Sequence, residues 1–126
     1  MKFSHSFLVS AEDIDEQGHV NNVAYVKWIQ AVAVAHWFSA TTKAEREKYI
    51  WMVTRHEIDY KKQAFETEEI TATTWVGELT RISWERFTEI TRDEDLLVKA
   101  RSVWCLIDRE TLKPTRITAE LKELFR

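Results

Sequence analysis

The feature that most constrains this 126-residue chain is a long apolar run between Asn22 and Ser39. Apolar side chains recur so often along it that a helix over this range would have almost no polar face. Such a helix needs other elements around it, and its alanines allow a sheet to approach closely. Asn21 or Asn22 is the expected N-cap, because a short polar side chain there can accept a free backbone N–H.

Most of the remaining chain has the alternation and the β-branched content of strands. A first strand is expected from about Lys2 to Ser10, before the helix. After the helix, the charged segment from Thr41 to Tyr49 predicts a short helix or a loop. A final short helix is expected to begin at Thr118. Between them we expect four long strands, over Trp51–Lys62, Glu69–Glu78, Ile82–Thr91 and Leu96–Ile107, with a tight turn over Arg92–Asp95.

The order of these elements predicts an α+β fold. The four long strands follow one another and look antiparallel, and an antiparallel sheet has one apolar face to offer a helix. One strongly twisted sheet curling around one central helix would bury the apolar surface of both. The length predicts a single domain over residues 1–126.

Composition excludes several classes of function. The net charge of −3 argues against general nucleic-acid binding. The N-terminus lacks the apolar core of a signal peptide, and no apolar run is long enough to cross a bilayer. Cys105 is the only cysteine, and the four histidines lack the spacing of a metal motif. We therefore expect a cytoplasmic protein without a membrane span, metal or cofactor.

The residues directly before the apolar run carry the chemistry. They read Asp-Ile-Asp-Glu-Gln-Gly-His-Val-Asn-Asn from Asp13 to Asn22, so two aspartates and a histidine share a short turn. The turn places a carboxylate near the amino end of the helix, where backbone N–H groups are free and carry partial positive charge. An oxyanion could be held there while the carboxylate attacks a carbonyl or activates water.

Each polar residue of this turn has two interpretations. Asp15 is the candidate nucleophile or general base, and the alternative is a carboxylate that only stabilises the turn. His19 hydrogen-bonds either the carboxylate, the substrate or the turn backbone. Asn22 is a candidate to cap the helix and to lend its N–H to an oxyanion site. Asp13 is expected to be structural, bonding N–H groups of the turn.

Further residues of the same region are candidates for substrate binding. Gly18 allows a turn with positive φ and a close approach of ligand, and Val20 follows it. Tyr25 and Trp28 are three residues apart on the helix, where they either pack in the core or line an acyl tunnel.

Phosphates of a carrier would need basic residues. Lys61 and Lys62 are the leading candidates, and isolated cations on strands are otherwise solvated surface residues. Cys105 lies between Trp104 and Leu106 and is expected to be a small buried hydrophobe. The other basic candidates are Arg55, Arg81 and Arg86.

The turn and the start of the helix together resemble the N-terminal signature of a known family. That family is the hotdog-fold thioesterases of the 4-hydroxybenzoyl-CoA thioesterase type, and the segment is also similar to the His-Val-Asn-Asn segment of plant acyl-ACP thioesterases. The segments Ile58-Asp59-Tyr60 and Ile107–Pro114 extend the resemblance more loosely to later strands. The matching residues are Asp13, Asp15, Gly18, His19, Val20, Asn21, Asn22, Tyr25 and Trp28.

The resemblance implies a hotdog fold, in which a five-stranded antiparallel sheet wraps around one long apolar helix. It implies a homodimer or homotetramer whose sheets pair edge to edge, with active sites at the dimer interface. Asp15 would match the catalytic carboxylate, and the backbone N–H near Asn22 would polarise the thioester carbonyl. The implied activity is hydrolysis of an acyl-CoA, with an acyl carrier protein as the alternative partner.

The chain also departs from the family pattern. Relatives often have Arg-Pro-Ala after the tyrosine of the second strand and then a Gly-Asp pair, and the stretch Lys61–Glu69 has neither. Gln30 stands at a helix position that is often acidic. The missing proline and Gly-Asp pair favour, weakly, one further alternative: a hotdog protein that binds acyl thioesters without hydrolysing them.

Overall fold

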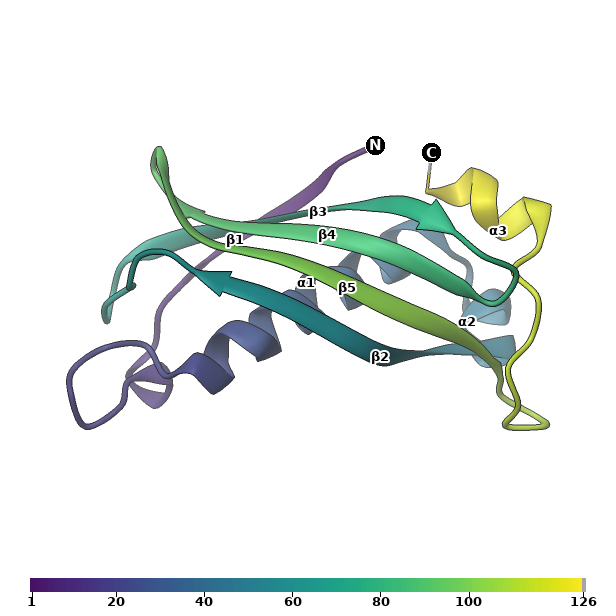
Figure 1. The fold of residues 1–126 in the computed structure, drawn as a ribbon, viewed down its shortest axis with the longest axis horizontal. Coiled ribbons are helices and arrows are strands. Elements are labelled where there is room, and N and C mark those ends of the chain that lie inside the picture. The colour runs from purple at the N-terminus through teal and green to yellow at the C-terminus, as the bar shows by residue number, and fades with distance from the viewer. Residues whose placement is uncertain (126) are drawn as a thin grey trace.

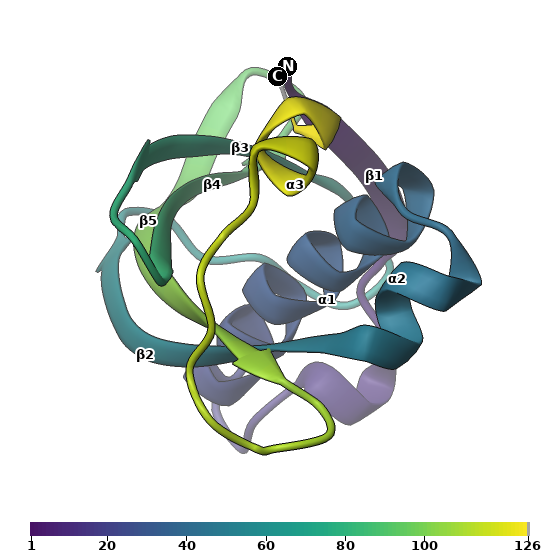
Figure 2. The same ribbon diagram turned by 90° about the vertical axis from the view of Figure 1, so that its right-hand side faces the viewer.

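The computed structural model describes residues 1–125. Within them, one antiparallel sheet of five strands curves around one long helix (Figures 1 and 2). The elements are β1 (Phe3–Leu8), a 3₁₀ turn (Ala11–Asp13), α1 (Asn22–Ala40), α2 (Lys43–Lys48), β2 (Tyr49–Tyr60), β3 (Glu69–Leu79), β4 (Ser83–Arg92), β5 (Asp95–Asp108) and α3 (Ala119–Leu124). The strand order is β1-β3-β4-β5-β2, so β1 and β2 form the two edges. The predicted sheet and its central helix are confirmed.

The local predictions hold with small shifts at the ends of elements. Each long strand begins and ends within two residues of its expected range. The charged segment after α1 forms α2, with Thr42 as its N-cap. The turn between β4 and β5 places Asp93 at a φ of 53°. Thr118 accepts the N–H of Leu121 and so begins α3 as expected.

The side of α1 that faces the sheet forms the centre of the core. Ile29 is 1% exposed and Val32 is fully buried. The opposite side of the helix is open, with Val23, Val34 and Phe38 exposed by 60%, 48% and 57%. The expectation that other elements cover α1 on every side is therefore wrong for the single chain, because a five-stranded sheet curves around only part of a helix.

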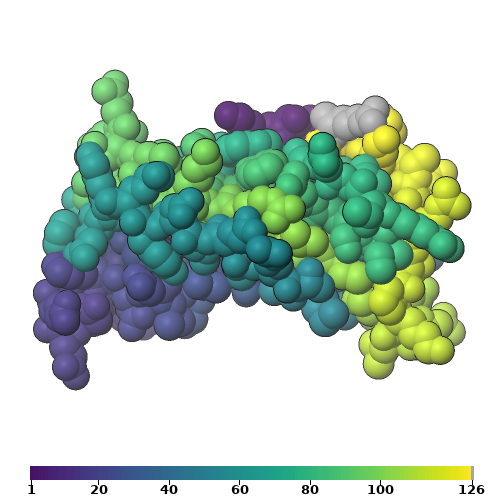
Figure 3. Space-filling view, in the orientation of Figure 1, coloured from purple at the N-terminus to yellow at the C-terminus, as the bar shows by residue number. Residues whose placement is uncertain are grey.

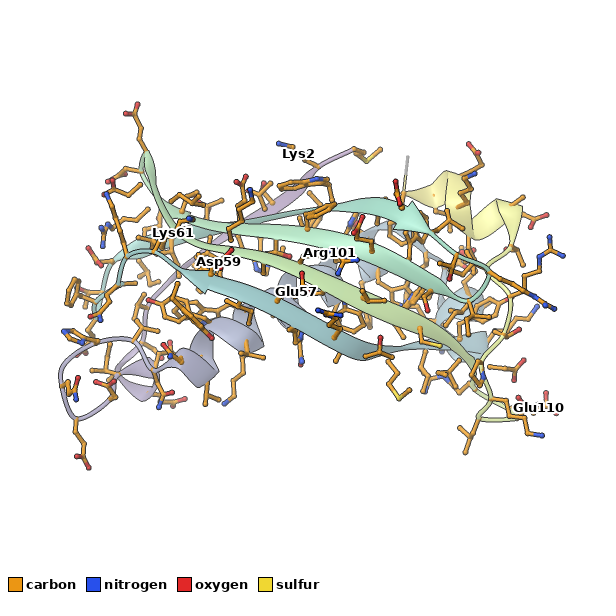
Figure 4. The ribbon with its side chains drawn as sticks, viewed as in Figure 1. Lys2, Glu57, Asp59, Lys61, Arg101 and Glu110 are labelled. Atoms are coloured by element: carbon orange, nitrogen blue, oxygen red, sulfur yellow. The ribbon has the colours of Figure 1, made fainter. Side chains whose placement is uncertain are left out.

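The outer face of the sheet is polar. Glu57 pairs with Arg55 and with Arg101, and Arg101 also binds Glu85 of the neighbouring strand (Figure 4). The inner face of β4 carries the alternate residues, among them Trp84 and Ile90, which are buried. This alternation is the one predicted for a sheet with a single apolar face.

The long axis of the molecule separates the two ends of α1. Figure 3 shows the dark blue segment that follows β1 at one end, and the yellow C-terminal segment at the other. The residues of the predicted site lie at the first of these ends, where α1 begins and β2 ends (Figure 1). None of the helices formed by residues 1–125 has the length and hydrophobicity that spanning a membrane requires.

Candidate active site

A cleft of about 530 Å³ opens where the turn before α1 meets the end of β2. It brings together seven of the predicted site residues from two distant parts of the chain. Its lining residues are Asp15, Gln17, His19, Val20, Asn21, Asn22, Tyr25, Tyr60, Lys61, Lys62 and Gln63.

The turn holds the Asp15 carboxylate in place. Its Oδ1 accepts the backbone N–H of Gln17 at 2.9 Å and of His19 at 3.2 Å. Gly18 has a φ of 82°, which other L-residues rarely adopt, so its predicted role in the turn is confirmed. Gly18 does not line the cleft. The second carboxylate oxygen of Asp15, Oδ2, accepts no hydrogen bond from residues 1–125 and is the one available for chemistry.

The start of α1 leaves one backbone donor unused. Asn21 is the N-cap, because its Oδ1 accepts the N–H of Val23 at 2.9 Å. The prediction that Asn22 caps the helix is therefore wrong, since Asn22 is the first helical residue. The backbone N–H of Asn22 has no acceptor within residues 1–125. A free donor at a helix amino end suits an oxyanion.

Asp13 has a structural role, as expected. Its Oδ2 accepts both the backbone N–H and the hydroxyl of Ser10, each at 3.1 Å. The backbone carbonyl of Asp13 accepts the N–H of Asn21 at 2.7 Å. Asp13 thereby links the end of β1 to the N-cap of α1.

His19 enters the turn through its backbone. Its N–H donates to Asp15 Oδ1 and its carbonyl accepts the N–H of Asp15 at 2.8 Å. Its imidazole packs edge-on against Phe65, with ring centroids 5.6 Å apart. Neither ring nitrogen bonds another residue in the described part of the chain, so the imidazole does not contact the Asp15 carboxylate as one interpretation had it.

Tyr25 attaches the loop after β2 to the helix. Its hydroxyl accepts the backbone N–H of Ala64 at 3.0 Å, and Val20 donates its N–H to the carbonyl of Ala64 at 3.1 Å. Burial raises the pKa of Tyr25. Trp28 packs edge-on against Tyr25 and Phe7 in the core and does not line the cleft, so of its two interpretations the structure shows packing in the core.

Replacing Tyr25 by phenylalanine is expected to lower the free energy of unfolding by about 1–3 kcal/mol, the cost of a buried N–H without an acceptor. The unbonded group would be the backbone N–H of Ala64. Urea denaturation measures this difference, and Tyr60→Phe is the matched control. Tyr60 is 44% exposed and its hydroxyl bonds no described residue. An equal loss in both variants would contradict the role given to Tyr25.

The basic candidates separate clearly in space. Lys61 is exposed at the end of β2, and its ammonium has no partner within residues 1–125 (Figure 4). Lys62 forms an ion pair with Asp95 at 2.9 Å, which lowers the pKa of that carboxyl. Arg55 pairs with Glu57. The other candidates, Arg81 and Arg86, do not line this cleft, and Arg86 is only 8% exposed.

Tyr60, Gln63 and Gln17 line the cleft without having been singled out for binding from the sequence. Tyr60 and Gln63 flank Lys61 and Lys62, so their proximity to the predicted lysines was the available signal. Cys105 is buried, as expected for a small hydrophobe.

Solved structures of similar shape come from several bacteria. A probable thioesterase from Bartonella henselae is 22% identical, with a TM-score of 0.81 over 93% of this chain and 98% of that one. The 1,4-dihydroxy-2-naphthoyl-CoA thioesterase Slr0204 from Synechocystis is 14% identical, with a TM-score of 0.85 over 99% and 96%. The protein SAV2348 from Staphylococcus aureus, solved in complex with CoA, is 16% identical, with a TM-score of 0.86 over 98% and 81%. These similarities confirm the predicted hotdog fold.

Sequence comparison gives the family. The chain is 26% identical over 88 residues to an acyl-[acyl-carrier-protein] hydrolase, the chloroplastic FATB3 of Cuphea viscosissima. The match covers 68% of this chain but only 21% of the Cuphea hydrolase, so this chain aligns with about a fifth of the length of that relative. The family model of the thioesterase-like superfamily matches residues 9–125. This range includes the Asp15 turn, α1 and all strands after it, and the chain therefore belongs to the thioesterase-like superfamily.

Proposed function

We propose that this protein hydrolyses acyl-CoA thioesters, with Asp15 as the catalytic carboxylate. The observation that carries the proposal is the pairing of two groups in one cleft. The Oδ2 of Asp15 and the backbone N–H of Asn22 both lack partners within residues 1–125, and both residues line the cleft. Membership of the thioesterase-like superfamily supports the reaction class.

The chemistry follows from these two groups. The N–H of Asn22 and the positive end of α1 would bind the thioester oxygen, which becomes negative as the tetrahedral intermediate forms. Asp15 Oδ2 would either attack the carbonyl carbon or take a proton from an attacking water. The C–S bond then breaks and the electron pair leaves with sulfur as a thiolate. A thiolate is a good leaving group, so this step needs no strong general acid.

The carrier is proposed to be CoA. The exposed ammonium of Lys61 at the rim of the cleft would contact a phosphate of CoA, while Lys62 is already paired with Asp95. Similarity to a CoA thioesterase and to a protein solved with CoA supports this carrier. The second candidate is an acyl carrier protein, which the similarity to the Cuphea hydrolase favours.

Release of free thiol from a panel of short, medium, long and aromatic acyl-CoAs tests the proposal. We expect release from at least one member, and a lower rate when the same acyl group is carried by acyl carrier protein. A faster rate with the carrier protein would support the second candidate. Saturable binding of acyl-CoA by folded protein, with no thiol released from either carrier, would instead show a binding protein and contradict the proposal.

We also propose a homodimer formed through β2. Within residues 1–125 this strand pairs only with β5, so its other side presents unpaired backbone groups, which sheet edges rarely leave uncovered. Exposed apolar side chains lie beside this edge and on the open side of α1. They include Val34, Phe38 and Met52.

Hydrogen exchange tests this interface against a control within the same chain. In a dimer joined through β2, the amides of β2 are expected to exchange much more slowly than those of β1, the other edge strand. Sedimentation should give twice the 15.0 kDa mass of the chain or a multiple of it. A stable monomer, or equal exchange at both edges, would contradict the proposal.

A further inference from the structure

A second cavity of about 210 Å³ lies between the carboxyl half of α1 and the sheet. It shares no lining residue with the Asp15 cleft. On α1 its first lining residue is Ala33, which lies about 12 Å along the helix from Tyr25 at 1.5 Å per residue. Aromatic side chains dominate its wall: Trp37, Trp51, Trp84, Trp104 and Phe125.

One wall residue, Arg86, is a buried cation without a counter-charge. It extends from the inner face of β4 and is 8% exposed. Its Nη1 donates to Nδ1 of His36 at 3.0 Å and to the hydroxyl of Thr74 at 3.1 Å. Both acceptors are neutral, and no carboxylate within residues 1–125 forms an ion pair with Arg86. A buried charge in this condition is costly.

The protonation of His36 adds a further unused donor. Arginine can only donate, so Nδ1 of His36 must accept, and the neutral imidazole then carries its proton on Nε2. Burial and the charge of Arg86 lower the pKa of His36 to about 4, so the ring is neutral at pH 7. Within the described residues, Nε2 of His36 and the indole N–H of Trp104 are enclosed without a partner.

Arg86 itself has donors to spare. Its Nε and Nη2 groups bond no acceptor within residues 1–125. Unlike Nε2 of His36, these two nitrogens are not fully enclosed, so they border open space. Arg86 lines the cavity. The region around the cavity therefore lacks acceptors and negative charge rather than donors.

The other charged wall residues leave this imbalance in place. Arg46 donates to the carbonyl of Thr41, and Arg109 donates to the carbonyls of Arg46 and Tyr49. Glu85, which also lines the cavity, is bound by Arg101. No carboxylate of residues 1–125 is thus left to balance Arg86.

We propose that this cavity binds a small apolar carboxylate, with Arg86 as its anchor. The Nε and Nη2 groups of a guanidinium form a planar pair of donors that matches the two oxygens of a carboxylate. The indole rings would cover the apolar body of the ligand. A cavity of about 150 Å³ holds benzene, so this one has room for a ring or a short alkyl chain together with the carboxylate.

The carboxylate has two possible sources. It is either a free acid or the far end of a dicarboxylic acyl group on a thioester. The second source rests on the proposed dimer. β2 runs from the cavity, where Tyr49 and Trp51 line the wall, to the cleft, where Tyr60 does. Antiparallel pairing of two β2 edges would place this cavity beside the Asp15 cleft of the partner subunit.

Tryptophan fluorescence tests binding without any need for catalysis, because four of the six tryptophans line the cavity. We expect the intact protein to bind octanoate at least tenfold more tightly than 1-octanol, which has the same chain without the charge. Arg86→Met should lose at least tenfold in octanoate affinity and keep its 1-octanol affinity. Arg86→Lys keeps the charge but not the paired donors, so its octanoate affinity should lie between those of the wild type and Arg86→Met. Arg81→Met, at an exposed position, is the control and should bind as the wild type does.

Equal affinity of the wild type for octanoate and 1-octanol would overturn the proposal. So would unchanged octanoate binding by Arg86→Met. If that variant does not fold, the comparison of the two ligands on the wild type still decides.

The rates on hexanoyl-CoA and adipoyl-CoA distinguish the two sources. If Arg86→Met lowers kcat/KM at least tenfold for adipoyl-CoA but not for hexanoyl-CoA, the cavity binds the far carboxylate of the acyl group. Unchanged rates on both, with octanoate binding lost, assign it to a free acid. If the protein hydrolyses no thioester at all, the binding comparison remains valid, so failure of the proposed function is separate from failure of this proposal.

Discussion

Replacing Asp15 by asparagine is expected to lower kcat/KM for thioester hydrolysis by about 100-fold or more, the loss typical of removing a general base. Asparagine keeps an Oδ1 that can accept the N–H groups of Gln17 and His19, so the turn should persist. It loses the negative charge and the nucleophilic Oδ2. The rate of thiol release by the two proteins measures the effect.

Asp13→Asn is the matched control, because Asp13 lies two residues away and its carboxylate bonds only Ser10 among the described residues. Its asparagine variant should retain nearly the full rate. Equal losses in the two variants would indicate damage to the turn rather than removal of a catalytic group. An unchanged rate for Asp15→Asn would contradict the assignment of Asp15.

A single turnover in ¹⁸O-labelled water tests whether Asp15 forms an anhydride with the acyl group. If the carboxylate attacks the thioester, water then attacks the resulting anhydride. Attack at the acyl carbon puts ¹⁸O into the product acid and returns both oxygens of Asp15 unlabelled, which is also the result of direct attack by an activated water. Attack at the aspartyl carbon puts ¹⁸O into Asp15. If Asp15 only activates water, ¹⁸O enters the product and none enters Asp15, so label found in the protein demonstrates the anhydride.

Replacing Ile29 by alanine is expected to lower the free energy of unfolding by about 2–5 kcal/mol, as for other buried Ile-to-Ala changes. Ile29 is 1% exposed at the middle of α1, where the sheet packs around the helix. The loss combines the removed apolar contact with the cavity left behind. This loss is a large part of the total free energy of unfolding of a small domain, which is roughly 5–15 kcal/mol. Urea denaturation at neutral pH gives the difference directly.

Leu8→Ala is the control for this change. Leu8 is 63% exposed at the end of β1, away from the proposed dimer interface, and surface substitutions of this kind usually alter stability by no more than about 0.5 kcal/mol. If both variants lost the same amount, the side of α1 facing the sheet would not be the centre of the core.

The candidate site divides into a part that was predictable and a part that was not. The turn from Asp15 to Asn22 is continuous in the chain, so its carboxylate, its glycine and its proximity to the helix start could be predicted directly. The direction in which the Asp15 carboxylate points could not be predicted. Its Oδ1 bonds the N–H groups of its own turn, and the choice between Asn21 and Asn22 as N-cap depends on backbone angles that both residues can adopt.

The helix shows the same division. Its extent was predictable because an apolar run of that length favours one long helix in any surroundings. Its open side, with Val23, Val34 and Phe38, was not, because the number of strands that curve around it sets how much of its surface is covered. The placement of Trp28 in the core has a related cause. A large aromatic residue three positions from Tyr25 can face either the cleft or the core, and packing against Phe7 of β1 decides for the core.

The sequence by itself determined the long helix, the strands, the cap of α3 and the chemical groups of the Asp15 turn, because these depend on residues close together in the chain. Only the tertiary structure decided which distant groups meet. The order β1-β3-β4-β5-β2 places the end of β2, with Lys61, beside the start of α1, and it buries Arg86 of β4 against His36 of α1. The physical reason is that such contacts depend on how the sheet curves and pairs, and no local pattern of residues encodes that curvature.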